Sequence, residues 1–207
     1  MTSPTRWAGV PLTDRRAERR ALLIAAAYRL FGEGGEAALS VRSVCRESEL
    51  NSRYFYESFA DVDELLGAVY DEVSAQLAAE VETAMAAAVE GAGEGAGDSL
   101  RARTRAGIAA VLGFSSADPR RGRILFTDAR ANPVLAARRA ATQDQLREAV
   151  LTEGWRLHPK SDPVAAQVGA AMYTGAMAEL AQQWLAGNLG DDLDRVVDYA
   201  LRLVLGR

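Results

Sequence analysis

A chain of 207 residues, of which 49% are hydrophobic, is long enough to bury a core as one compact protein or as two small domains. This composition excludes a disordered chain, and a single cysteine excludes an internal disulfide. No apolar run approaches a membrane span and no secretion signal is recognisable, so we expect a cytoplasmic protein without a membrane partner.

The net charge of -4 hides an uneven distribution. Residues 1–58 carry nine arginines and seven acidic residues, whereas the remainder carries fifteen basic and twenty-one acidic residues. The arginines that precede or open the first predicted helix are Arg6, Arg15, Arg16, Arg19 and Arg20. They fit a basic arm that binds phosphates or a minor groove, and they fit equally well a helix start that keeps the protein soluble.

Residues 40–65 predict a short helix, a tight turn and a second helix. The hydroxyl of Ser40 can accept from a first-turn amide and start a helix of about eight residues. Asn51 supplies the second N-cap, and Phe55 and Phe59 recur at i and i+4, which gives that helix a buried side. This is the layout of a helix-turn-helix DNA reader.

A third helix is predicted to open at Asp61, with Glu64 three positions later in a capping-box arrangement. Arg53, Tyr54 and Glu57 lie off the buried side of the second helix, so we expect them to face solvent or a partner.

These residues, together with the preceding helix, resemble the TetR family of transcriptional repressors over roughly residues 16–70. The preceding helix carries the family's two aliphatics, paired alanines and Leu-Phe, here Leu23, Ile24, Ala26, Ala27, Leu30 and Phe31. The resemblance implies that Tyr56 contacts a phosphate and that the first turn of the second helix faces the major groove. The DNA-binding residues that it implies are Arg42, Asn51, Ser52, Arg53, Tyr54 and Tyr56.

Three residues depart from the family pattern. Glu49 stands where a turn glycine is usual, so we expect a strained or altered turn. Arg53 replaces a small residue and adds a fork-shaped donor suited to guanine or to phosphate. Val62 stands where many members carry a lysine that touches the DNA backbone, so one phosphate contact is expected to be missing.

The rest of the chain has only helical patterns. Apolar residues at i, i+3, i+4 and i+7 run from Val62 to Val81, and a glycine-rich stretch at residues 91–97 predicts a flexible loop before a new cap at Asp98. Prolines and capping residues predict the remaining helices over residues 119–128, 133–153, 163–186 and 193–205. Gly154 is expected to end the second of these.

Apolar residues of the last two predicted helices recur on broad faces, which fits either an intramolecular core or a subunit interface. TetR-like proteins dimerise through their last two long helices, so the resemblance favours a homodimer whose two-fold symmetry matches a palindromic operator. The predicted interface residues are Leu180, Trp184, Leu193, Val196, Val197, Ala200, Leu201 and Val204.

The resemblance also implies a small-molecule effector that binds the C-terminal helices and lowers operator affinity. We expect an apolar or aromatic molecule, although each large side chain there is also explained as ordinary core. The predicted ligand-binding residues are Phe114, Phe126, Trp155, Met172, Tyr173 and Met177. The lone His158 precedes a proline in a predicted loop and is interpreted as a surface residue.

Specific absences argue against an enzyme. A Ser-His-Asp site would depend on His158, yet the chain has no GxSxG motif, and Cys45 is predicted to pack inside the first helix of the motif. A helical di-metal site needs two Glu-x-x-His pairs, whereas this chain has one histidine. We therefore expect no catalysis, no cofactor and no metal.

The sequence thus predicts an all-α protein with a flexible arm at residues 1–12, a helix-turn-helix domain at residues 13–60, and a helical effector-binding and dimerisation domain at residues 61–207. The expected function is a ligand-responsive transcriptional regulator, a repressor by resemblance, that binds a palindromic operator in double-stranded DNA and is released by a small molecule. The alternative is a helical dimer that has lost DNA binding and binds a small molecule or a protein.

Overall fold

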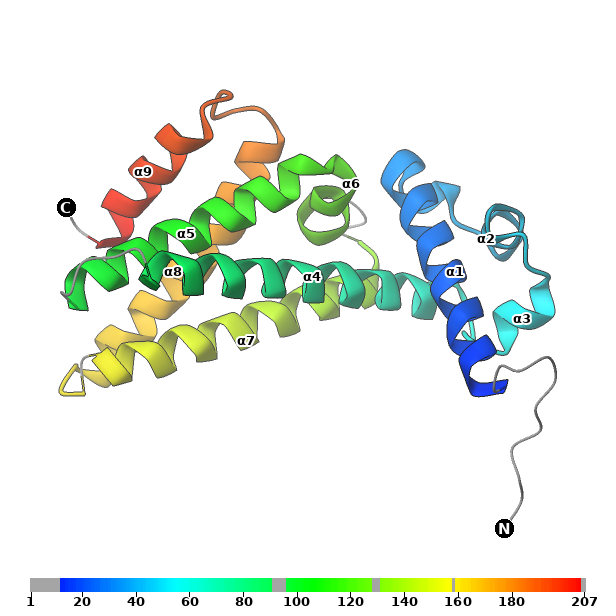
Figure 1. Cartoon of the computed structure of the whole chain (residues 1–207), viewed down its shortest axis with the longest axis horizontal. Helices are drawn as coiled ribbons and strands as arrows, with labels where there is room; N and C mark the ends of the chain where they lie inside the picture. The colour runs from blue at the N-terminus through cyan, green and yellow to red at the C-terminus, as the bar shows by residue number, and fades with distance from the viewer. Residues whose placement is uncertain (1–11, 91–95, 128–130, 158, 206–207) are drawn as a thin grey trace, which may run out of the picture.

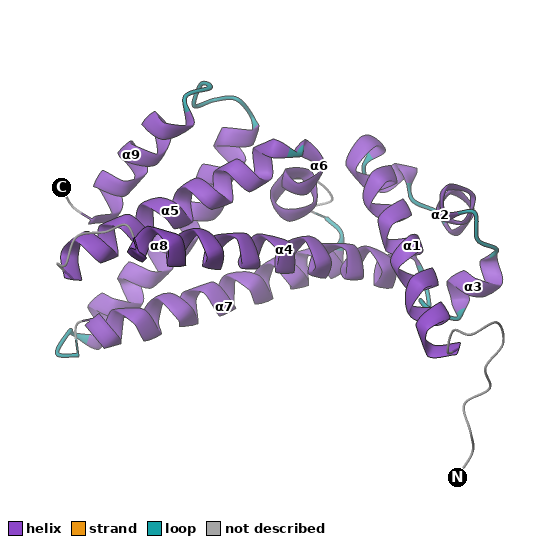
Figure 2. Cartoon of the chain, viewed as in Figure 1, coloured by secondary structure: helices purple, strands orange, loops and turns teal. Residues whose placement is uncertain are grey.

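The computed structural model describes residues 12–90, 96–127, 131–157 and 159–205, and these ranges contain helices, turns and no strand (Figure 2). The first helices gather at one end of the molecule, and a long helix runs from them into a bundle formed by the rest of the chain (Figure 1). The predicted all-α fold with an N-terminal helix-turn-helix is therefore confirmed. Among the described residues, no helix is long and apolar enough to cross a membrane.

The N-terminal end consists of α1 (Leu12–Gly34), a short 3-10 turn η1 (Glu36–Ala38), α2 (Val41–Ser48) and α3 (Ser52–Tyr56). Both predicted N-caps are present. The Ser40 hydroxyl accepts from the Ser43 amide at 3.0 Å, and the Ser43 hydroxyl accepts from the Ser40 amide at 2.9 Å. These reciprocal bonds fix the start of α2, where the sequence predicted a single cap.

The turn between α2 and α3 keeps a left-handed residue although no glycine is present. Glu49 has φ 57° and ψ 25°, and the amide of the next residue, Leu50, bonds the carbonyl of Cys45 at 3.0 Å. A residue with a Cβ pays about 1–2 kcal/mol for this conformation. The expected strain is therefore present, but the turn has the geometry that a glycine would give it.

Helix α4 (Val62–Glu90) connects the two ends of the molecule. Asp61 accepts from the amide of Glu64 at 2.8 Å, as predicted, but the Glu64 carboxylate accepts from the amide of Ala60 at 2.6 Å instead of that of Asp61. The first turns of α4 complete the core under the N-terminal helices. That core includes Leu23, Ala27, Phe31, Val44, Phe55, Phe59, Leu65, Leu66, Val69 and Tyr70, and it extends to Ile124, Leu125 and Leu135 of the bundle.

The bundle contains α5 (Ala96–Ala117), α6 (Pro119–Gly122), a π-helical turn η2 (Arg123–Thr127), α7 (Pro133–Leu157), α8 (Pro163–Leu185) and α9 (Leu193–Leu205). Asp118 and Asn132 cap α6 and α7, as the sequence predicted. A second core of α5, α8 and α9 consists of Ile108, Leu112, Met177, Ala181 and Val197.

The structure differs from the predicted boundaries at Leu12, Gly97 and Gly154. The arm predicted at residues 1–12 lies outside the described residues except for Leu12, which begins α1, and residues 91–95 of the predicted loop also lie outside them. Gly97 is inside α5, because a helix tolerates glycine near its start. Gly154 does not end α7, because it keeps a helical conformation and the helix continues to Leu157.

Candidate nucleic-acid interface

The outer side of α3 presents two large side chains to solvent. The Arg53 side chain is 84% exposed and Tyr56 is 61% exposed, whereas Phe55 between them is fully buried. The Tyr56 ring meets the edge of the Phe55 ring, with centroids 5.4 Å apart. The buried aromatic therefore anchors a short helix whose other face is available to a partner.

Asn51 and Ser52 lie at the exposed start of α3. The side-chain oxygen of Asn51 accepts from the amide of Tyr54 at 3.2 Å, so it caps the helix and its side-chain NH₂ group is the part suited to a base or phosphate. Arg42 is exposed on α2. The structure thus places Arg42, Asn51 and Ser52 on the surface, where the sequence predicted them.

Tyr54 differs from the other predicted DNA-binding residues because it is half-buried. The guanidinium of Arg19, from α1, lies 4.4 Å from the centre of the Tyr54 ring. Such a cation–π contact uses the ring face, and it fixes α3 against α1. We therefore correct the placement of Tyr54 from the groove-facing turn to the contact between these two helices.

The arginines that open α1 are also engaged by the protein itself. Arg16 donates to the backbone carbonyl of Glu57, and the guanidinium of Arg20 lies 4.8 Å from the centre of the Phe59 ring. These contacts hold Arg16, Arg19 and Arg20 against α3 and the residues that follow it, while Arg16 and Arg20 stay exposed, so phosphate binding by the basic arm remains a prediction. Arg6 lies outside the described residues.

A polar cluster joins α1 to α6, where the N-terminal end meets the bundle. The Tyr28 hydroxyl donates to Asp118 Oδ2 at 2.6 Å, and Arg120 donates to both oxygens of the same carboxylate at 2.9–3.2 Å. Close by, Arg123 Nη1 donates to the carbonyl of Gly32 at 2.6 Å. This junction has no local sequence signal, because Tyr28 and Asp118 are 90 residues apart.

The environment of the junction shifts two pKa values in opposite directions. Hydrogen bonds from the Arg120 side chain, assisted by the Tyr28 hydroxyl, hold the pKa of Asp118 at about 2. Burial, with the bond to Asp118, raises the pKa of Tyr28 to about 12. Asp118 is therefore ionised and Tyr28 is protonated near neutral pH, as a hydroxyl-to-carboxylate hydrogen bond requires.

The six predicted ligand-binding residues are not brought together. Tyr173 and Met177 line a groove of about 590 Å³ between α8 and α9, whereas Met172 is 69% exposed elsewhere on α8. Phe114 packs against the N-terminal core, and Phe126 packs against both that core and the core of α5, α8 and α9. Trp155, half-buried on α7, is not among the residues that line the groove. The structure thus brings Phe126, Tyr173 and Met177 to one core, and it does not bring all six residues to a single pocket.

Two of the predicted interface residues also need correction. Val197 and Leu201 of α9 are 0% and 1% exposed within one chain, so they belong to its own core. The half-buried side chains that pack beside them are Leu180, Trp184, Leu193, Val196 and Ala200. Val204 is 40% exposed. The large apolar side chains that are most exposed on α8 and α9 are Val164, Val168, Met172, Tyr199 and Leu203.

The described residues contain no group of three or more His, Cys, Asp or Glu side chains that could hold a metal ion. Cys45 packs partly against the N-terminal core, as predicted, and burial raises the pKa of its thiol. His158 lies outside the described residues.

Sequence comparison connects the helix-turn-helix with known proteins. Residues 23–69 match the family described as bacterial regulatory proteins, tetR family. The HTH-type transcriptional repressor Rv3405c of Mycobacterium tuberculosis is 37% identical over 73 residues, which cover 32% of this chain and 39% of that protein. The chain thus spans about two fifths of the length of that relative.

Solved structures extend the likeness to nearly the whole chain. A putative transcriptional regulator from Pseudomonas aeruginosa PAO1 is 18% identical, with 92% of this chain and 90% of that chain covered and a TM-score of 0.70. The regulator FadR from Bacillus subtilis, solved with stearoyl-CoA, is 16% identical, with 89% and 96% covered and a TM-score of 0.69. At these identities the likeness establishes a shared fold. The helices at residues 23–69 thus match the tetR family of bacterial regulatory proteins in sequence, and the chain shares the fold of these solved regulators.

Proposed function

We propose that the protein is a transcriptional regulator that binds a palindromic operator in double-stranded DNA as a homodimer and responds to a small molecule. The observation that carries the proposal is the outer face of α3, where Arg53 and Tyr56 are exposed on a helix that is capped by Asn51 and anchored by Phe55. A rigid helix with exposed hydrogen-bond donors is what reading of a major groove requires.

In this proposal, residues 13–60 contact DNA, and residues 61–207 bind the effector and the second subunit. The two parts share the core that α4 completes, and the Tyr28–Asp118–Arg120 cluster connects them at the surface. A change in the bundle is therefore able to shift α1, and with it α3, without unfolding either part. The action proposed is repression, with the effector releasing DNA.

A second copy of the chain is the partner that suits the exposed apolar faces of α8 and α9. Val168 and Met172 on α8 are 51% and 69% exposed, and Tyr199 and Leu203 on α9 are 52% and 86% exposed. Large apolar side chains that are exposed in this way mark interaction surfaces. A two-fold axis through this surface would pair each face with itself and place two α3 helices on successive major grooves.

The proposed effector is an apolar or aromatic small molecule. Tyr173 and Met177 support a site beside α8, because they line the groove between α8 and α9 and Met177 is buried. Tyr199 and Leu203 line the same groove, so the proposed effector site adjoins the proposed subunit face. Burial also raises the pKa of Tyr173, so its hydroxyl is a neutral hydrogen-bond donor in that groove. The groove is mostly apolar, and Asp191, Asp192 and Arg195 also line it, so it suits a molecule with an apolar body and a polar end.

Selection of bound fragments from a random DNA pool by the purified protein tests the proposal. We expect the selection to enrich a palindrome that two subunits bind. The proposed location of such a regulator is the cytoplasm. The alternative function is a helical dimer that has lost DNA binding, and it is favoured if no sequence is enriched at low salt. The positions of Arg53 and Tyr56 on the outer face of α3 argue for the first function.

A further inference from the structure

Glu57, the residue that follows α3, is the centre of a charge cluster beside the exposed face of that helix. Its Oε1 accepts from Arg53 Nε at 3.0 Å, and its Oε2 lies 3.6 Å from Arg19 Nη2. The two oxygens of one carboxylate are thus divided between an arginine of α3 and an arginine of α1.

The two arginines are held very differently. The Arg19 side chain is 24% exposed and stacks on the ring of Tyr54, whereas the Arg53 side chain is 84% exposed. The backbone carbonyl of Glu57 also accepts from Arg16. Arg16 and Arg19 of α1 therefore hold Glu57 in place, and Glu57 in turn holds the solvent-exposed side chain of Arg53.

The bond to Nε leaves the other end of Arg53 available. Within the described part of the chain, the structure gives Nη1 and Nη2 of Arg53 no acceptor. These two nitrogens form a parallel pair of donors that matches O6 and N7 of guanine. Because Glu57 restrains the side chain before DNA binds, less rotamer entropy remains to be lost when the contact forms.

We propose that Glu57 is a positioning residue that orients Arg53 for the recognition of guanine in the operator, an inference that rests on the proposed DNA-binding function. Glu57 acts through Arg53 and contacts no base itself. Its negative charge also repels phosphates, so Glu57 raises sequence discrimination while it lowers affinity for DNA in general.

The test compares two duplexes by fluorescence anisotropy. The first is the palindrome enriched by the parent protein, and the second has adenine in place of the guanine at which Arg53→Ala loses discrimination. We expect Glu57→Gln to lower the ratio of the two affinities roughly tenfold, within the range of one bidentate arginine–base contact. Affinity for unrelated DNA should rise, because each subunit loses one negative charge near the phosphates.

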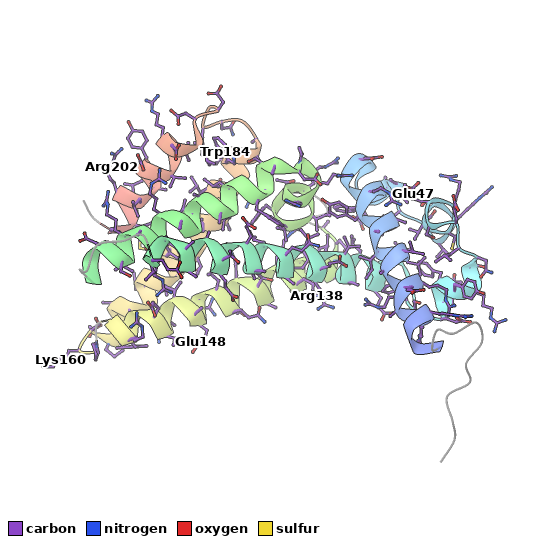
Figure 3. All side chains as sticks on the ribbon, viewed as in Figure 1. Glu47, Arg138, Glu148, Lys160, Trp184 and Arg202 are labelled. Carbon is purple, nitrogen blue, oxygen red and sulfur yellow. The ribbon has the colours of Figure 1, made fainter. Side chains whose placement is uncertain are left out.

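Two further variants separate charge from geometry. Glu47→Gln removes the same charge from the same domain, but Glu47 bonds Arg29 of α1 at 2.8 Å and lies on the α1–α2 side of this end of the molecule (Figure 3). It should leave the ratio unchanged. Glu57→Asp keeps the charge and shortens the side chain, so it should lower the ratio without raising affinity for unrelated DNA.

A double-mutant cycle completes the test, with circular dichroism to show that each variant is folded. In the Arg53→Ala background, Glu57→Gln should no longer change the ratio. The positioning role is overturned if Glu57→Gln has the same affinity ratio as the parent protein. It is also overturned if Arg53→Ala still binds DNA and discriminates guanine from adenine at every position of the palindrome as well as the parent does. Failure of the parent protein to enrich any duplex would instead overturn the proposed function itself.

Discussion

Replacement of Leu203 by aspartate gives the sharpest test of the proposed homodimer. Leu203 is 86% exposed on α9, so the chain's own core does not depend on it. Complete burial of a leucine side chain by a partner stabilises the contact by about 1.5–3 kcal/mol. A two-fold interface contains the residue twice, which gives roughly 3–6 kcal/mol, or about two to four powers of ten in the dissociation constant.

Sedimentation equilibrium over a range of protein concentrations measures this change. We expect the parent protein to have the mass of two chains and Leu203→Asp to have the mass of one, with the helical content preserved. Leu146→Asp is the matched control, because Leu146 is 40% exposed on α7, outside the proposed interface. A two-chain mass for Leu203→Asp, equal to that of the control, would refute the assignment of this face to the interface.

Three further predictions concern the junction, the packing of α6 and the DNA contact. The ionised Asp118 carboxylate, whose pKa is held at about 2, stabilises the fold above the usual value of 3.8, and this contribution is lost as the pH falls through 2. Acid unfolding of Asp118→Asn, followed by circular dichroism, should therefore be less steep below pH 4 than that of the parent protein. Identical acid transitions would count against this. In Gly122→Ala, the new Cβ would lie 2.6 Å from a methyl carbon of Leu185, so thermal unfolding should show a free energy of unfolding lower by about 1–3 kcal/mol. Gly154→Ala is the control, because its Cβ would have no neighbour within 4 Å, and it should be at least as stable as the parent. Arg53→Ala should weaken operator binding by about 1–3 kcal/mol and relax its specificity, as anisotropy would show, and unchanged binding would remove Arg53 from the interface.

The helix-turn-helix end was predictable in detail because its determinants are local. Ser40 and Asn51 cap helices through bonds to amides three residues away, and Phe55 and Phe59 bury one face at helical spacing. Even the departure at Glu49 was visible in the sequence, since the turn geometry requires a left-handed residue there.

The bundle was less predictable because an apolar stripe does not reveal which neighbour covers it. Val197 and Leu201 have the spacing expected of an interface, but both are buried within one chain, and Val197 packs with residues of α5 and α8. The bond between Tyr28 and Asp118 joins segments 90 residues apart and has no local pattern. The Arg53–Glu57 pair at the other end of the molecule did have a usable signal, since residues four apart on a helix are neighbours.

Titration of the enriched palindrome with the parent protein at several salt concentrations tests the central claim most directly. If the outer face of α3 binds DNA, the logarithm of the affinity should fall linearly with the logarithm of the salt concentration, with a slope of about 0.9 for each phosphate neutralised. Two subunits should occupy each palindrome, and Arg53→Ala should bind it more weakly. An affinity that does not change with salt concentration, or no binding at low salt, would contradict the assignment of α3 as the DNA-binding helix.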